Sequence, residues 1–428
     1  MTRPNSSWGQ RIGDVFETRF PSRPGAWRTL GREAEHPVVH ADGTAADIGV
    51  LWARLAELGK FEVKRERDLI VGLDSPEVQY SAEVGVGTIE VIVGPANDLH
   101  GIRDAYERGI ERLVKATDAE GLRVLGFGIQ PVTVATPSIM TAKRRYKVLL
   151  DVLGDMWLSF AVTASDQVHV SVSREEVVAA TNLTNLLAPV SIALCANSSV
   201  VGGKPAGVCS AREAHMGVIG AEANRHGMVE GPISDLAGWI ERTLDMEHLM
   251  RREGGQIVPS SGTFRAWLDA NVTHDLAAYD AWDYHEHYVW NSARPRAAHG
   301  TVELRSPCQQ PWPEHMAAAA LGAGLVTAHA EIAQWIDAAA GVDAWPLLSA
   351  WHATAIRDGL AADEPIPGLL HAILDRAHDG LKARGRGEEV YLAPLRARVE
   401  RRRNPGQEAV AVLTQDGLPA LIERLTVR

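Results

Sequence analysis

The stretch VQYSAEVGVGTIEVIVGP, residues 78–95, predicts two neighbouring strands joined by a short glycine-containing turn. Its valines, isoleucines, tyrosine and threonine are residue types that favour strands, whereas the central Gly-Val-Gly is typical of a tight connection. Strands joined by so short a turn run antiparallel. After Pro95 the period changes: residues 98–121 repeat apolar side chains at spacings of three and four and end on Gly121, which predicts a helix.

Strand and helix patterns follow one another irregularly along the rest of the chain. Strands are predicted at 31–43, 61–67, 123–132 and 166–173, and helices at 46–60, 143–156, 175–199, 316–336 and in a charged segment, 381–403. The sequence contains no regular βαβ rhythm, no GxGxxG and no P-loop. We therefore predict an α+β fold with an antiparallel sheet that helices cover on one side.

The N-terminal 25 residues are polar and contain three prolines, Pro4, Pro21 and Pro24. We expect residues 1–25 to be a poorly ordered lead. No low-complexity linker interrupts residues 26–428, so a single domain is expected there.

Composition excludes several classes of protein. With 428 residues, 46% hydrophobic and 23% charged, the chain is globular, and its net charge of -11 argues against a nucleic-acid partner. Three cysteines without CxxC spacing predict neither a disulfide framework nor a zinc site, which fits a reducing cytoplasm. No run has the length of a membrane span or a signal peptide. We expect a soluble, cytoplasmic protein without a membrane partner, either a monomer or a homodimer.

Several glutamates lie on predicted strands in positions that bring carboxylates together. Glu33 and Glu35 in GREAEHP are two residues apart, so one strand sends both to the same face. Glu83 and Glu90 flank the Gly-Val-Gly, and Glu303 lies in HGTVELRSP, residues 299–307. Like charges raise one another's pKa, and a divalent cation is the usual compensation. Each glutamate alone reads as a surface residue, but three clusters together favour a site for Mg²⁺ or Mn²⁺.

HGTVELRSP also places Arg305 on the same strand face as Glu303. An acid fixed beside a cation suits a metal ion bound next to a transferring phosphate, although for this pair taken alone a cross-strand salt bridge on a solvated face is the favoured explanation. In SDQVHVSV, His169 shares a face with Gln167. Those two could supply metal ligands or contact a nucleotide phosphate, and the histidine could also be structural.

Candidate cations for an anionic substrate lie in three other segments. KRRYK, 143–147, offers Arg144 or Arg145 at a helix start, with a solvated basic turn as the alternative. The glycine-rich NSSVVGGKPAGVCSARE, 197–213, carries Lys204 and Arg212. HYVWNSARPRAAHG contributes two more residues that could line the mouth of a site, Trp290 and Arg294, of which Trp290 could simply be core.

Taken in order, these motifs resemble the glutamate-cysteine ligase family of the second type, the carboxylate-amine ligases of the glutamine-synthetase-like superfamily. GREAEH resembles the family's GxExE strand, AEVGVGTIEV its next pair of metal glutamates, and RRYK its GRYK. NSSVVGGKPAGVCSAR resembles its NSPxxxGKPxGxxSxR loop, and WNSARPRAAHGTVELR its WxxRPxxGTxExR block. The resemblance covers about residues 31–310.

The resemblance implies a funnel of antiparallel strands with helices packed outside, holding ATP, Mg²⁺ and glutamate. It implies metal ligation by the five glutamates and His169, nucleotide contacts from Gln167, His169 and Lys204, and substrate contacts from Arg145, Arg212, Trp290 and Arg294. Glu303 and Arg305 would be catalytic, with Arg305 against the transferring phosphate. The implied reaction phosphorylates the γ-carboxylate of glutamate, and the amine of an amino acid then attacks, giving a γ-glutamyl dipeptide.

The chain departs from the family where the plant-like branch has EPGGQFELSG and this sequence has EVGVGTIEVIVG. The acceptor is therefore left open between cysteine and another, possibly unusual, amino acid. Two alternatives also stay open at this point. One is an ATP-dependent ligase or kinase that uses another carboxylate or a guanidino substrate, and the other is a non-catalytic binding protein that retains the fold.

Overall fold

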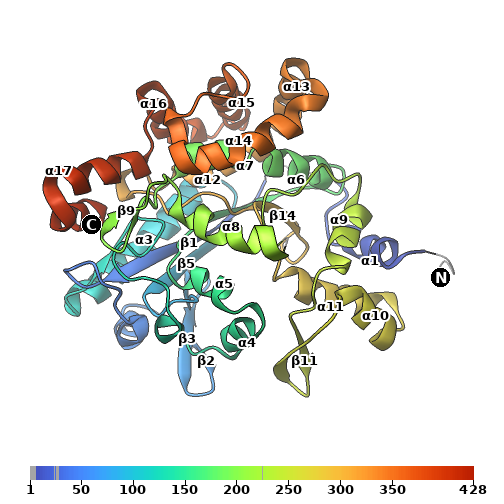
Figure 1. Cartoon of the computed structure of the whole chain (residues 1–428), viewed down its shortest axis with the longest axis horizontal. Helices are drawn as coiled ribbons and strands as arrows, with labels where there is room; N and C mark the ends of the chain where they lie inside the picture. The colour runs from blue at the N-terminus through green and yellow to red at the C-terminus, as the bar shows by residue number, and fades with distance from the viewer. Residues whose placement is uncertain (1–5, 24, 26–27, 224) are drawn as a thin grey trace.

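An antiparallel sheet forms the centre of the computed structural model, which describes residues 6–23, 25, 28–223 and 225–428 (Figure 1). Its strands follow the order β14-β15-β7-β1-β5-β4-β3-β2, with β6 beside β1, and each ladder is antiparallel. The strand bounds are β1 Leu30–Val39, β2 Glu62–Glu66, β3 Leu69–Asp74, β4 Gln79–Ala82, β5 Thr88–Ala96, β6 Arg123–Val124, β7 Asp166–Ser171, β14 Ala293–Arg296 and β15 Thr301–Leu304. With helices on the sheet, the predicted α+β class is confirmed.

The sheet separates a core face from a polar face, because side chains alternate along each strand. In β1, Arg32, Ala34 and His36 are buried on the core face, while Glu33 and Glu35 point the other way. The core face packs against α12, Ala317–Thr327, whose small residues allow a close approach to β7. A Cβ added at Gly322 would lie only 3.2 Å from Cβ of Val168.

Helices gather on the core side in the upper part of Figure 1. They include α6 Val177–Leu186, α7 Ala188–Cys195, α13 His329–Ala339, α14 Ala344–Asp358, α15 Leu369–Ala383 and α16 Ala393–Arg401; α3 Leu99–Ala119 packs on β5, and α17 Pro405–Leu425 ends the chain. The opposite side carries α4 Arg144–Leu153 and α5 Asp155–Leu158, which lie below β1 and β5 in the same view. The polar face of the sheet therefore faces α4 and α5, and a site can lie between them.

Two long predicted helices are broken in the structure. The helix predicted at 175–199 is divided into α6 and α7, because Pro189 in the first turn of α7 cannot donate the hydrogen bond that would continue α6. The helix predicted at 316–336 is divided into α12 and α13. In the described part of the chain no single helix is long and apolar enough to cross a membrane, although two bent pairs, α6 with α7 and Trp312–Thr327 with α13, meet that test on length and composition.

The N-terminal segment differs from the expected poorly ordered lead. Within it, α1, Trp8–Glu17, is capped by Ser7 and packs against α9, Leu236–Leu244, and α11, Asp275–Glu286. The helix forms because Ile12 and Phe16 stand four residues apart and bury one apolar face, which the prolines and polar residues around them obscured. Residues 1–5 of the predicted lead and the predicted domain start at residue 26 lie outside the described residues.

Candidate active site

A cavity of about 240 Å³ lies on the polar face of the sheet, closed on its other side by α4, α5 and residues 287–290. Strands β1, β5, β7, β14 and β15 supply its floor. Eleven of the thirteen predicted site residues line it: Glu33, Glu35, Glu83, Glu90, Arg145, Gln167, His169, Trp290, Arg294, Glu303 and Arg305. Residues from distant parts of the chain therefore meet where the motifs predicted one site.

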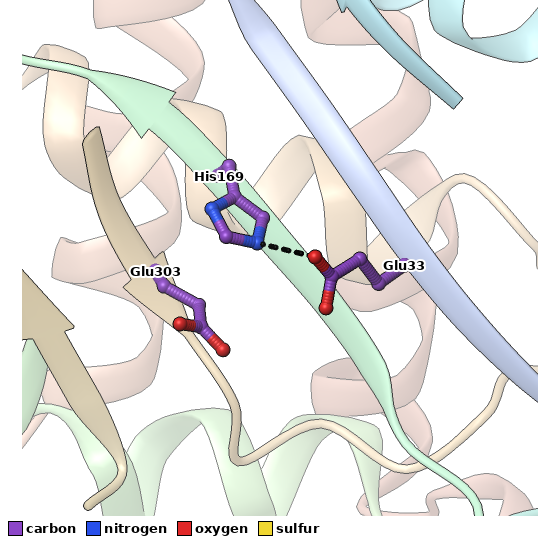
Figure 2. Close-up of side chains that lie close together, drawn as sticks. All are labelled: Glu33, His169 and Glu303. Atoms are coloured by element: carbon purple, nitrogen blue, oxygen red, sulfur yellow. Dashed lines mark hydrogen bonds and ion pairs between the residues drawn. The ribbon is translucent and has the colours of Figure 1, made fainter. Parts of the chain in front are cut away.

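Strand register explains how three of these side chains come together. His169 on β7 is paired with Glu303 on β15 and, on its other side, with Gly31 on β1. Because Gly31 has no side chain, the space beside the imidazole stays free for Glu33, whose Oε1 lies 3.1 Å from His169 Nε2 (Figure 2). One ligand atom from each of Glu33, His169 and Glu303 lies within 4.8 Å of the others.

A second cluster of carboxylates lies along the same face of the sheet. Glu35 on β1 is directly opposite Glu90 on β5. Burial, reinforced by the carboxylate of Glu83, raises the pKa of Glu35 to about 7, and burial with Glu83, Glu33 and Glu35 raises the pKa of Glu90 well above its ordinary value. The fold thus holds these acids where their charged forms repel one another. A bound cation would offset this repulsion.

Glu303 has the opposite environment. Burial alone would raise the pKa of Glu303, but Arg294 and Arg305 hold this pKa well below its ordinary value. Arg294 Nε donates to Glu303 Oε2 at 2.8 Å, and Arg305 donates to Glu303 Oε1. Glu303 and Arg305, the acid and the cation of HGTVELRSP, are therefore in direct contact, as the salt-bridge alternative predicts. Their contact lies inside the cavity and not on a solvated face.

Arg294 is bound more tightly by protein groups than its predicted role as a substrate contact requires. Its Nη1 donates to the main-chain carbonyls of Glu286, His287 and Val289 at 2.9–3.2 Å. With Nε on Glu303, most of its donors are occupied. The guanidinium fixes Glu303 and the chain leading to β14, Ala293–Arg296, while the substrate contact of Arg294 stays a prediction.

Gln167 connects the cluster that contains Glu303 with the cluster that contains Glu35. Its side-chain nitrogen lies 3.2 Å from Glu35 Oε1 and 2.9 Å from Ser165 Oγ, while its oxygen accepts from Arg305. Arg305 therefore reaches from Glu303 to Gln167, and it keeps about an eighth of its side chain exposed to the cavity. Directly after β15, it is well placed to meet an anion.

An aromatic wall closes the cavity opposite the acids. Trp290 packs 5.5 Å from Trp157 and 4.9 Å from Phe160 between ring centres, so this tryptophan both lines the site and belongs to a small core. Sequence reasoning missed the rest of the lining, namely Val84, Tyr146, Leu149, Trp157, Phe160, His287, Tyr288, Arg296 and His299. Of these only Arg296 had a usable signal, because it stands two residues beyond Arg294 in the same predicted segment, HYVWNSARPRAAHG.

Two predicted site residues are not among the described residues that line the cavity. Lys204 lies exposed on β9, Lys204–Pro205, in a two-residue hairpin with β8, Val200–Val201. Arg212 at the start of α8, Ala211–Ala223, is buried and donates to Glu213 and to the carbonyl of Ser306. Arg212 thus supports the chain after β15, and its charge lowers the pKa of Glu35 from behind the cavity wall, whereas Lys204 is exposed away from the lining.

Comparisons with known proteins agree with this geometry. The chain matches the glutamate-cysteine ligase family 2 (GCS2) over residues 29–418. It is 25% identical over 369 residues to the chloroplastic glutamate–cysteine ligase of Brassica juncea, covering 81% of this chain and 69% of that protein.

Two solved structures share the fold. One is a bifunctional glutathione synthetase from Pasteurella multocida, with a TM-score of 0.58 and 14% identity over 97% of this chain; this chain spans 52% of that longer protein. The other is the glutamate–cysteine ligase of Francisella tularensis in complex with AMP, with a TM-score of 0.54 and 12% identity over 94% of this chain and 88% of that one.

Proposed function

The chain belongs to the glutamate-cysteine ligase family 2 and is an ATP-dependent ligase, and on that premise we propose that it joins the γ-carboxylate of glutamate to the amine of an amino acid. The product would be a γ-glutamyl dipeptide, with ADP and phosphate released. The observation that carries this proposal is the set of five carboxylates that shares one cavity with Arg305 and Arg145. Acids alone would repel a nucleotide, whereas acids beside arginines that face the same cavity suit a cation and a phosphate together.

The donor set fits Mg²⁺ or Mn²⁺. Glu33, His169 and Glu303 offer three donors within 4.8 Å, and the raised pKa values of Glu35 and Glu90 indicate uncompensated negative charge beside them. Mg²⁺ prefers oxygen ligands, and Mn²⁺ also accepts an imidazole. Such a cation would neutralise the charge on the phosphates of ATP.

The protein's own side chains would act by position and charge. A γ-carboxylate oxygen attacks the terminal phosphorus of ATP, the bond to the bridging oxygen breaks and ADP leaves. Arg305 would lie against the transferring group, because its guanidinium faces the cavity from beside Glu303. Arg145, which lines the cavity from α4, would bind a carboxylate of glutamate, and the wall of Trp157, Phe160 and Trp290 would keep water from the acyl phosphate.

The test is an ADP-release assay with Mg-ATP, glutamate and a panel of amino acids, in which the dipeptide is identified by its mass. We expect ADP release to require glutamate, and we expect Arg305→Ala to lower kcat by about 10³-fold, since it removes a charge that contacts the phosphoryl group. Arg265→Ala is the matched control, because Arg265 forms surface ion pairs with Glu241 and Asp245. Glutamate-independent ADP release, or full turnover of a folded Arg305→Ala variant, would contradict the proposal.

A further inference from the structure

A second and larger cavity adjoins the first. Its volume is about 770 Å³, against about 240 Å³ for the cavity on the sheet, and the two share Arg145, His287 and Tyr288 as a common wall. Its other sides come from the end of α11 and from a hairpin of β11, Met250–Glu253, and β12, Gln256–Pro259, which lies below α11 in Figure 1. A molecule bound here would reach the reacting carbonyl across a single layer of side chains.

The hairpin that forms one side is held by the start of α4. Arg144 Nε donates to the carbonyl of Ile257 at 3.2 Å, and the main-chain N–H of Arg144 donates to Glu66. The next residue, Arg145, lines both cavities. The β11–β12 hairpin and the wall between the cavities therefore share one anchor, so the position of the hairpin is tied to that of the site.

Charges of both signs face the second cavity. Asp280 and Asp283 stand one helical turn apart on α11 and, within the described residues, have no ion-pair partner. Arg252 comes from the facing hairpin, where its guanidinium stacks 4.7 Å from the centre of the Tyr284 ring and likewise meets no carboxylate among the described residues. Opposed unpaired acids and an unpaired arginine match the ammonium and carboxylate of a free amino acid.

The remaining lining is mixed: Trp267, Tyr284, Ile257 and Ala281 form an apolar and aromatic part, and the charged part includes Glu66, Lys143 and Arg251. A cavity of this size is within the usual range for a whole small-molecule ligand. The CH₂–SH side chain of cysteine would leave most of it filled only by water. The lining instead suits a long or aromatic side chain, which would remove these apolar surfaces from water.

Resting on the proposed function, we propose that the second cavity is the acceptor subsite, and that it takes an α-amino acid with an apolar or aromatic side chain larger than that of cysteine. The acceptor's amine lone pair attacks the carbonyl carbon of the glutamyl phosphate beside Arg145. A C–N bond forms, the C–O bond to phosphate breaks, phosphate leaves and the excess amine proton passes to solvent.

The experiment compares amino acids with hydroxylamine, a small nucleophile that captures the acyl phosphate as a hydroxamate without filling the second cavity. We expect kcat/KM for leucine, phenylalanine or tryptophan to exceed that for cysteine by about tenfold. Arg252→Ala should raise KM for the better acceptor by about tenfold, the effect of one lost charge-assisted hydrogen bond, and should leave KM for glutamate in the hydroxylamine reaction within about twofold. Lys147→Ala is the control, since Lys147 lies on the outer face of α4 in a surface pair with Asp151.

A second variant tests the size of the subsite. Ala281→Phe fills the cavity, so it should lower kcat/KM for the large acceptors more than that for cysteine, while hydroxamate formation reports that the enzyme is folded and active. Hydroxamate formation together with a preference for cysteine, unchanged by Arg252→Ala, would overturn this inference alone. Absence of any glutamate-dependent hydroxamate would overturn the proposed function as well.

Discussion

At the scale of single residues, carboxylates of the same site have opposite electrostatic environments. Glu303 is held charged by arginines, whereas Glu90 is surrounded by other acids. Sequence reasoning gave both the same role, because period two along a strand shows which face a side chain takes but not which strand lies beside it. The pairing of Glu35 with Glu90 depends on the register of two strands 55 positions apart, and that of Arg294 with Glu303 on the register of β14 against β15.

The environment of Glu90 leads to a prediction about stability. Glu90→Gln removes one of several buried like charges, so in metal-free buffer it should raise the midpoint of thermal unfolding by about 2 °C. Ligase activity should fall at the same time, since a proposed metal ligand is lost. Circular dichroism melts with EDTA and with Mg²⁺ would measure this, and Mg²⁺ should stabilise the wild type more than the variant.

Glu77→Gln is the matched control for this prediction. Glu77 accepts hydrogen bonds from Arg108 and Arg112 near the surface, and these bonds lower its pKa. Its loss should leave the midpoint unchanged or slightly lower, the opposite sign to Glu90→Gln. A metal-free Glu90→Gln protein that melts below the wild type would show that the acids are compensated by the fold itself.

At the scale of elements, the Gly-Val-Gly between β4 and β5 has a different role from the one expected. The sequence predicts a tight, flexible turn, but a Cβ added at Gly85 would lie 1.9 Å from the carbonyl oxygen of Ala161. This glycine allows the chain beside Glu83 to contact the segment that follows α5. The aromatic wall is thereby set against the acids, a contact between parts of the chain 76 positions apart that no local pattern reveals.

Gly85→Ala should therefore destabilise the protein by about 2 kcal/mol, because either the backbone or residue 161 must move. Activity should fall as well, since Glu83 is two residues away. Gly217→Ala, in α8, is the control: nothing lies within 4 Å of its added Cβ, and alanine favours a helix, so stability should be unchanged or higher. Urea unfolding of both variants makes the comparison, and equal midpoints would contradict the close approach.

Much of the fold class could be predicted because strand and helix periods are local properties. The α3 helix and the acids of β1 were predicted correctly from spacing alone. The positions of Lys204, exposed on β9, and of Arg212, buried on α8, could not be predicted, since a glycine-rich loop indicates a functional segment without showing where its side chains point. The aromatic wall was missed for a related reason: tryptophan and phenylalanine read as core, and here a small core is also the wall of the site.

At the scale of the whole molecule, one face of the sheet stabilises the fold and the other carries the site. The core face buries apolar side chains under α12 and its neighbours, so the polar face can carry repelling acids without losing the fold. The layer that covers the polar face is made from helices and loops with a separate, smaller core. Its position relative to the sheet depends on contacts at the edges, and α1 provides one of them.

Phe16 on α1 is 1% exposed, and its ring centre lies 4.8 Å from that of Trp282 on α11. Because α11 leads directly to His287 in the wall between the cavities, loosening α1 should affect both stability and turnover. Phe16→Ala should lower the free energy of unfolding by about 3 kcal/mol, whereas Val50→Ala, at a side chain 51% exposed, should change it by less than about 0.5 kcal/mol. Urea unfolding followed by tryptophan fluorescence would measure both. A poorly ordered N-terminal lead would instead make the two variants equally stable, so this comparison decides between the prediction from sequence and the packing of α1 against α11.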